Sequence, residues 1–219
     1  MLAVAAGLAL LVCATDLDSC NSSVVTDDDF DEADRQLVAL HTFELLDSLR
    51  RTSHPDTVTP YYGEVSRAGM AQLLGRMELG ESDRFLDFGC GVGRWLLAAV
   101  QHGCKHVFGI EYIAARADIA RNVLGERATI MQGDGNDAAV WDAAKPSHVV
   151  AYDLLWRQEA KAAFEDTIAR ERCVRWVVRF NARPLPGFTL IASQVVSTHP
   201  NDIERFIAFT WVRATTLPV

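Results

Sequence analysis

The chain has 219 residues, of which 49% are hydrophobic and 23% charged, and its formal net charge is −8. This composition is ordinary for a globular protein, and the length suffices for one domain with a terminal extension. The acidity is local, because eight acidic residues and no Lys or Arg lie between Thr15 and Asp34, while the remainder is formally neutral. No block of Lys and Arg forms a nucleic-acid-binding arm, so independent DNA affinity is not expected.

The apolar N-terminal run, Leu2 to Cys13, is too short to span a bilayer, which needs roughly 20 residues. A signal peptide, a short helix packed on the domain and the cut edge of a longer protein remain alternatives, although no basic n-region precedes the run. The five cysteines are odd in number and lack metal-ligand spacing. We therefore expect no membrane span and no metal site, and a reducing compartment.

An N-terminal extension is expected over residues 1–57, followed by the main domain over residues 58–219. Within the extension, Asn21 to Asp31 is polar and acidic and is predicted to be a loop. From Asp29 to Arg50, apolar residues recur at near-helical spacing, which predicts an amphipathic helix. A loop containing two prolines then leads into the main domain.

The region from Arg84 to Glu111 has the pattern of a strand, a glycine turn, a helix and a second strand. The first strand, Phe85 to Phe88, runs into the glycines of the sequence Gly-Cys-Gly-Val-Gly. An amphipathic helix is predicted from Arg94 to about His102, and the second apolar run ends at Glu111. This is the βαβ unit of a parallel sheet, in which glycines let the backbone approach a ligand closely.

The spacing of the glycine turn narrows the choice of ligand. A dinucleotide-binding turn has glycine at its sixth position, where this chain has Arg94, and a P-loop needs Gly-Lys-Ser/Thr. The pattern Asp87-x-Gly89-x-Gly91-x-Gly93 instead resembles motif I of the Rossmann-like S-adenosylmethionine-dependent methyltransferases. The resemblance implies that these residues and Glu111 bind S-adenosyl-L-methionine. The alternative is a turn that serves only strand-to-helix packing.

The rest of the chain alternates helical and strand patterns. A helix is predicted from Tyr112 to Leu124 and another from Gln158 to Arg170. Further strands are predicted over Ala128 to Asp134, His148 to Asp153, Val174 to Phe180, Phe188 to Val196 and Phe206 to Arg213. The expected fold is therefore α/β: a Rossmann-like class I methyltransferase with a seven-stranded, mostly parallel sheet and a C-terminal antiparallel hairpin.

A narrower resemblance rests on three motifs that occur together. Tyr62-Gly63-Glu64 opens a segment predicted to be helical through about Met77, and Gly-x-Gly-Val-Gly and Cys104-Lys105-His106 with Gly-x-Glu follow. Over roughly Tyr61 to Trp156 the chain resembles the disruptor-of-telomeric-silencing family of histone lysine methyltransferases, which lack a SET domain. The resemblance implies further cofactor contacts from Tyr62, Glu64, Gly133 and Asp134, with Asp134 on the adenine amino group. As an alternative, Gly-Asp is ordinary turn chemistry.

The chain departs from that family where it places two adjacent Asn residues, because Tyr152 and Asp153 stand here. A carboxylate adds negative charge beside a sulfonium and an incoming amine, and either helps to desolvate the amine or marks a different acceptor. Val65 replaces a typical Thr. Tyr152, Asp153 and Trp156 are the candidate catalytic residues, with core packing as the alternative role for Trp156. Candidate walls of a lysine channel are Tyr152, Trp156, Phe180 and Trp211.

The resemblance implies methyl transfer from S-adenosyl-L-methionine to a lysine of a core histone, with a histone or nucleosome as partner and the nucleus as location. The lack of a basic stretch and the departure at Asp153 favour an alternative, a class I methyltransferase that acts on a small molecule or a non-histone protein, located in the cytoplasm. A third possibility is a protein that binds the cofactor without turnover.

Overall fold

The computed structural model describes residues 28–33, 35–36, 64–154, 156–199 and 205–214. The apolar run Leu2 to Cys13, the expected loop before the main domain and Tyr62 lie outside these ranges, so the predictions made for them stay predictions.

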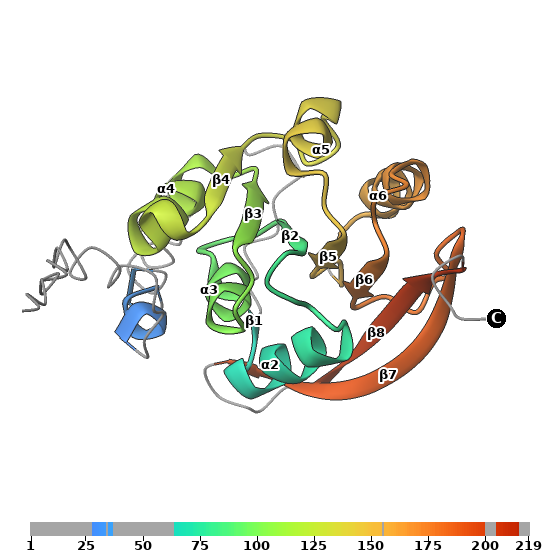
Figure 1. Cartoon of the computed structure of the whole chain (residues 1–219), viewed down its shortest axis with the longest axis horizontal. Coiled ribbons are helices and arrows are strands. Elements are labelled where there is room, and N and C mark those ends of the chain that lie inside the picture. The colour runs from blue at the N-terminus through green and yellow to red at the C-terminus, as the bar shows by residue number, and fades with distance from the viewer. Residues whose placement is uncertain (1–27, 34, 37–63, 155, 200–204, 215–219) are drawn as a thin grey trace, which may run out of the picture.

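The described chain forms a sheet with helices on both faces (Figure 1). The strands are β1 (Glu64–Val65), β2 (Arg84–Phe88), β3 (His106–Glu111), β4 (Thr129–Gln132), β5 (His148–Ala151), β6 (Trp176–Arg179), β7 (Phe188–His199) and β8 (Arg205–Arg213). The helices are α2 (Arg67–Arg76), α3 (Arg94–Gln101), α4 (Ala114–Leu124), α5 (Ala138–Ala144) and α6 (Gln158–Arg170), with a 3-10 turn η1 (Gly125–Arg127). None of these helices combines the length and apolarity needed to cross a membrane.

The strand order is β1-β7-β8-β6-β5-β2-β3-β4. Strands β4, β3, β2, β5 and β6 are parallel, whereas β8 is antiparallel to β6 and β7 is antiparallel to β8. The seven predicted strands and the C-terminal antiparallel hairpin are therefore confirmed. Because the carboxyl ends of the parallel strands meet at one edge, the loops that follow them gather there.

An eighth strand among the described residues corrects the prediction for Glu64 and Val65, which were expected to open a helix. Glu64 pairs with His199 and Val65 with Thr198 at the end of β7. The helix begins only after Ser66, whose hydroxyl accepts a hydrogen bond from the Gly69 amide at 3.3 Å. Such an N-cap residue has extended backbone, which lets the preceding two residues join the sheet.

Two apolar clusters pack on the two faces of the sheet. One joins α2, α3 and α4 to the sheet, and the other joins α5 and α6. Helix α5 was not predicted from the sequence; it begins after Asp137, whose carboxylate caps the Ala139 amide at 3.0 Å. Trp141 is buried and donates its indole hydrogen to the Gly135 carbonyl at 2.8 Å, which ties α5 to the loop before it.

The N-terminal residues that the structure describes are helical, over 28–33 and 35–36. This confirms the start of the helix predicted from Asp29, while the rest of that helix lies outside the described residues. The loop prediction for Asn21 to Asp31 is wrong for residues 28–31, because Phe30 is 1% exposed and draws this segment onto the core.

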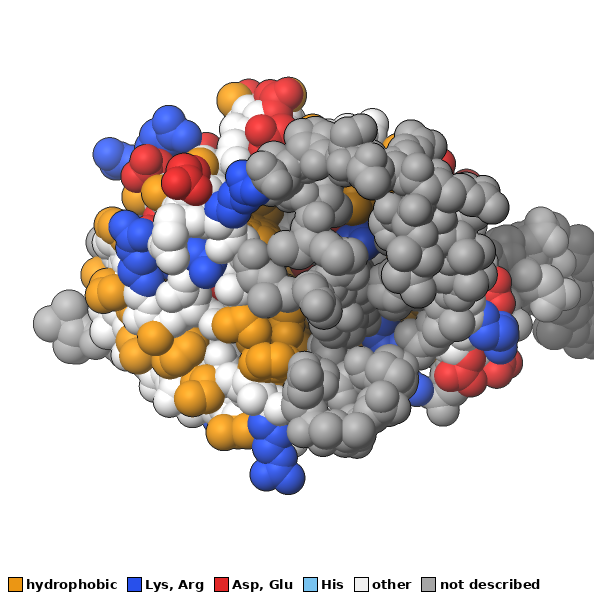
Figure 2. Space-filling view, turned by 180° about the vertical axis from the view of Figure 1, so that it is seen from behind, with side chains coloured by type: hydrophobic (Ala, Val, Ile, Leu, Met, Phe, Trp, Pro, Cys, Tyr) orange, Lys and Arg blue, Asp and Glu red, His pale blue; other side chains and the backbone are white. Residues whose placement is uncertain are grey.

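The connection from β6 to β7 contains Pro184 and Pro186 and is a loop without a helix. Large apolar side chains are exposed on the hairpin that follows, at Leu190, Ile191, Val195 and Ile207. Figure 2 shows apolar side chains gathered on the side of the molecule that faces away from the viewer in Figure 1.

Candidate active site

The glycine turn is held by the carboxylate at the end of the neighbouring strand. Glu111 is buried; its Oε2 accepts a hydrogen bond from the Gly91 amide at 2.8 Å, and its Oε1 accepts one from the Ile113 amide at 2.9 Å. Gly91 has a φ of 53°, a conformation that other residues adopt only with strain. A carboxylate has about four acceptor positions. Glu111 can therefore hold the turn and still accept further hydrogen bonds.

Close packing fixes the two ends of the same turn. A Cβ atom at Gly93 would lie 2.6 Å from Leu124 Cδ1 on α4, and one at Gly109 would lie 2.7 Å from Cys90 Sγ. Burial raises the pKa of the Cys90 thiol well above its ordinary value, so the thiol stays protonated and packs as a small apolar side chain. Strand-to-helix packing, which was the alternative role for the glycine turn, is therefore one of the roles of these glycines.

The end of β4 reaches the same edge of the sheet. The Gly133 amide donates to the Glu111 carbonyl at 3.0 Å. Asp134 is exposed, and its Oδ1 accepts hydrogen bonds from the amide and side chain of Asn136, at 2.9 and 3.2 Å. This is the ordinary turn chemistry that the sequence left open, and it leaves the predicted adenine contact of Asp134 a prediction. Asp87, near the end of β2, is 2% exposed.

The predicted catalytic residues follow β5, but they do not form one cluster. Tyr152 packs on the α2–α3 side, with its ring 4.6 Å from that of Phe180 and 6.2 Å from that of Phe206. Trp156 packs on the α5–α6 side, 5.4 Å from the ring of Phe88. The two aromatic residues therefore flank the sheet edge from opposite faces.

Trp156 is the aromatic residue that meets the glycine turn. A Cβ atom at Gly89 would lie 3.7 Å from Trp156 Cζ2. The same side chain packs against Phe164 of α6, so it takes part in the core as well. Trp211, a candidate channel wall, is 5% exposed and lies in the core cluster on the α5–α6 side.

Asp153 lies fully buried in a network of ion pairs. Its Oδ2 accepts two hydrogen bonds from Arg179, from Nε at 2.8 Å and Nη2 at 2.5 Å, and its Oδ1 accepts one from the Phe180 amide at 2.9 Å. Arg179 also donates to Glu165 at 2.9 Å, and Glu165 lies 3.2 Å from Arg183 at the surface. The negative charge that Asp153 adds is thus compensated by an arginine, and its predicted direct catalytic role stays a prediction.

Sequence reasoning did not identify Arg179, Glu165 or Lys161. Lys161 is 8% exposed and donates to the Leu154 carbonyl at 3.2 Å, which ties the loop after β5 to α6. One signal was available: Arg179 stands in the apolar run Trp-Val-Val-Arg-Phe, where a buried cation needs a partner. The partner itself was not evident, because the two residues are brought together only by the pairing of β5 with β6.

The motif before α2 is described only in part. Glu64 belongs to β1, and its side chain and Tyr62 lie outside what the structure describes. Ser66, which follows Val65, caps α2 and accepts a hydrogen bond from Ser197 Oγ at 3.3 Å.

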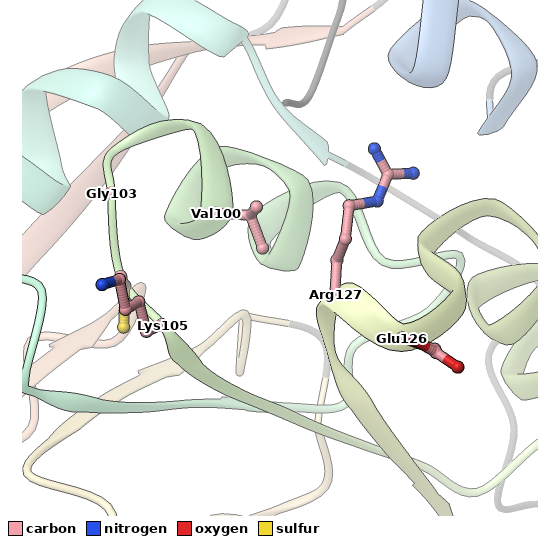
Figure 3. A pocket seen from close by; sticks show the side chains of 6 residues that line it. Val100, Gly103, Lys105, Glu126 and Arg127 are labelled. Carbon is pink, nitrogen blue, oxygen red and sulfur yellow. The ribbon is translucent and has the colours of Figure 1, made fainter. Parts of the chain in front are cut away.

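A hollow of about 300 Å³ lies at the opposite edge of the sheet, near the amino ends of β3 and β4 (Figure 3). It is lined by Val100, Gly103, Cys104, Lys105, Glu126 and Arg127. Burial raises the pKa of the Cys104 thiol, and Arg127 is bonded to Asp29. The hollow is therefore separate from the glycine turn and offers no activated thiol there.

The strand order, the glycine turn after β2 and the antiparallel β7–β8 pair define a Rossmann-like class I methyltransferase fold. The chain is similar in structure to TrmN from Thermus thermophilus, with 17% identity and a TM-score of 0.54 over 67% of this chain and 48% of TrmN, about half its length. An RNA methyltransferase from Salinibacter ruber, solved with S-adenosyl-L-homocysteine, is 20% identical with a TM-score of 0.53 over 70% of this chain and 95% of that one. Magnesium protoporphyrin IX methyltransferase from Synechocystis PCC 6803, with bound S-adenosylmethionine, is 20% identical with a TM-score of 0.51 over 67% of this chain and 77% of that one.

The family described as "Histone methylation protein DOT1" matches residues 49–151. This confirms the resemblance drawn from the Tyr-Gly-Glu motif and the glycine turn, over a little less than half of the chain. A search of curated proteins found no match.

Proposed function

We propose that this chain is an S-adenosylmethionine-dependent methyltransferase whose acceptor is a lysine side chain of a core histone. The observation that carries the proposal is the contact between Glu111 and the Gly91 amide, which places a carboxylate beside a glycine turn at the carboxyl edge of the sheet. The family match over residues 49–151 and the methyltransferases of the same fold support it. The histone acceptor, and with it the nuclear location and the nucleosome partner, rest on the family match alone.

The described residues fit a sulfonium nucleoside. A Cβ atom added to Gly133 would meet no other atom within 4 Å, and the Gly133 amide is bonded to the Glu111 carbonyl. The end of β4 therefore borders open space next to Glu111. The N-terminus of α3 follows the glycine turn and favours the negative charge of an amino-acid carboxylate. When bound, S-adenosylmethionine supplies an electrophilic methyl group and leaves as the neutral thioether. Glu111, the turn amides and Asp134 are the groups that would hold it.

On the acceptor side the protein needs to position an amine in its neutral form. Tyr152 and Trp156 offer apolar walls on the two faces of the sheet edge, and an apolar setting disfavours the ammonium form of lysine. Asp153 does not oppose this, because Arg179 compensates its charge. Methyl transfer is a displacement that depends on alignment, and the proton of the amine leaves to solvent.

The second candidate is a class I methyltransferase that acts on a small molecule or a non-histone protein. It is favoured by the absence of a Lys/Arg block from the sequence, because a protein that acts on nucleosomes has to approach DNA phosphates.

The test is to incubate the full-length protein with methyl-labelled S-adenosylmethionine and, separately, with nucleosomes, free histones and a metabolite extract. Label on a histone lysine is expected. Label found only in small molecules would reject the histone acceptor and retain the methyltransferase. Calorimetric binding of S-adenosylhomocysteine without transfer to any acceptor would indicate a binding protein without turnover. Gly91→Arg is the matched control and should transfer no label.

A further inference from the structure

We propose that Phe30 is a positioning residue that joins the start of α2 to the start of α3 and so keeps the glycine turn in its cofactor-binding form. The inference rests on the function proposed above. It gives the described part of the N-terminal extension, residues 28–33 and 35–36, a role in the site.

The ring of Phe30 touches two arginines that each open a helix. The Arg67 guanidinium carbon lies 4.2 Å from the ring centroid, and that of Arg94 lies 5.5 Å from it. Arg67 is the first residue of α2, which follows the Tyr-Gly-Glu motif, and Arg94 is the first residue of α3, which follows the glycine turn. One side chain from the extension therefore contacts the first residues of two helices, each of which follows a motif predicted to bind the cofactor.

Besides packing against the core, the Phe30 ring interacts electrostatically with the two guanidinium groups. The N-terminus of a helix carries a partial positive charge, so an arginine in the first turn is unfavourable there. Arg94 is also 1% exposed, which deprives its charge of water. The face of an aromatic ring attracts a guanidinium, and Phe30 offers its ring to both cations. Removing the ring leaves two like charges at adjacent helix starts with less compensation.

A second contact anchors the same segment to the C-terminal end of α4. Asp29 accepts two hydrogen bonds from Arg127, at 3.1 and 2.8 Å, and both side chains are mostly buried. Arg127 also donates to the carbonyls of Val123 and Leu124, the last two residues of α4. Figure 3 shows the Arg127 side chain pointing from the end of α4 toward the N-terminal helical segment. Leu124 in turn packs against Gly93, so the anchor reaches the glycine turn through α4.

The experiment compares full-length variants in which one buried side chain is truncated on each face of the sheet. Phe30→Ala removes the bridging ring. Ile168→Ala, in the fully buried part of α6, removes a core side chain on the other face of the sheet. Phe30→Tyr is the conservative variant that keeps the ring. Each is measured for S-adenosylhomocysteine affinity by calorimetry and for its urea midpoint.

Phe30→Ala is expected to weaken S-adenosylhomocysteine binding about tenfold. Ile168→Ala should lower the urea midpoint but keep the affinity within about twofold of the parent. Phe30→Tyr should bind as the parent does. Equal effects of Phe30→Ala and Ile168→Ala on affinity, or no effect of Phe30→Ala, would overturn the positioning role. If the parent protein does not bind S-adenosylhomocysteine, the proposed function fails, and amide hydrogen exchange decides the positioning role separately. Faster exchange over residues 89–96 in Phe30→Ala than in Ile168→Ala supports it, and equal exchange rejects it.

Discussion

The two halves of the carboxyl edge of the sheet are built on different principles. Around β2, β3 and β4, the site is made of backbone: glycine amides, one carboxylate at hydrogen-bond distance from Gly91, and a turn after Gly133. Around β5 and β6, it is made of side chains: aromatic rings on the two faces and a buried chain of ion pairs from Asp153 through Arg179 and Glu165 to the surface. We call the part around β2, β3 and β4 the cofactor half and the part around β5 and β6 the acceptor half, after their proposed ligands. The cofactor half is formed by one βαβ unit and the turn after β4, whereas the acceptor half is held together by side-chain contacts between strands.

This difference predicts how each half fails. A change at Gly91 or Glu111 is expected to remove a ligand contact and leave the fold intact, because Glu111 bonds backbone amides and not a buried cation. A change in the acceptor half exposes a buried charge without its partner, and therefore affects stability before it affects chemistry. The four predictions below test this, from the largest expected effect to the smallest.

Arg179→Met should produce the largest loss of stability. It leaves the buried carboxylates of Asp153 and Glu165 without their shared cation, and removing one partner of such a pair costs about 3–5 kcal/mol. Urea denaturation measures the loss. Arg183→Met is the control: its side chain is half exposed, so it should cost less than about 1 kcal/mol. The double variant Arg179→Met with Asp153→Asn should recover part of the loss; no recovery would separate Asp153 from the network.

His148, at the amino end of β5, is a buried titratable residue that should make the free energy of unfolding depend on pH without affecting the candidate site. Burial lowers the pKa of His148 to about 4, and the ring bonds the Met77 carbonyl at 2.9 Å. As pH falls below the ordinary value of about 6.5, the unfolded chain takes up a proton that the folded chain does not. Stability is therefore full above pH 6.5 and is lost as pH falls toward 4, by about 3 kcal/mol.

Denaturation midpoints of the parent and His148→Gln across this pH range test the assignment. The variant should lack the dependence on this group, whatever stability it loses at neutral pH. A parallel pH dependence in both proteins would show that another group is responsible. Cofactor affinity relative to the parent should not change with this substitution, because the ring lies at the amino end of the strand.

Gly91→Arg and Glu111→Ala should abolish cofactor binding in the other half of the edge while the chain still folds. The first adds a side chain at a positive φ, and the second removes the carboxylate that holds the turn. An affinity loss of at least about 100-fold, or about 2.7 kcal/mol, is expected by isothermal titration with S-adenosylhomocysteine. Gly75→Arg is the control, because it adds the same charge on α2, where a Cβ meets nothing within 4 Å. Unchanged affinity in both site variants would refute the pocket assignment.

Deletion of residues 1–28 should have the smallest effect. It removes much of the acidic stretch but keeps Asp29 and Phe30, whose contacts with the domain the structure describes. Cofactor affinity should stay within about tenfold, or about 1.4 kcal/mol. A larger loss would place part of the deleted segment in the site.

Sequence reasoning reached the cofactor half because its signals are local. Glycines at fixed spacing, an acid at a strand end and apolar runs specify a βαβ unit within 28 residues, from Arg84 to Glu111. Helix α6 was predicted with its exact ends for a related reason, since its amphipathic pattern is uninterrupted. Strand β1 was missed because two residues carry no periodicity and their partner lies at the far end of β7.

The acceptor half could not be derived in the same way. Asp153 and Arg179 are 26 residues apart, and only the parallel pairing of β5 with β6 brings them together. The position of Phe30 between two helix starts is likewise a tertiary fact, because neither arginine is near it in sequence. A buried charge in an apolar run signals that a partner exists but does not identify it.

The pairing of Asp153 with Arg179 also restricts how this lineage can change. In a protein with asparagine after β5, Glu165 alone would hold the arginine on β6, so the arginine there is less strongly required. Once the aspartate is present, loss of the arginine passes through a destabilised intermediate, and loss of the aspartate leaves the cation in need of another partner. The two positions are therefore expected to be replaced together and not one at a time.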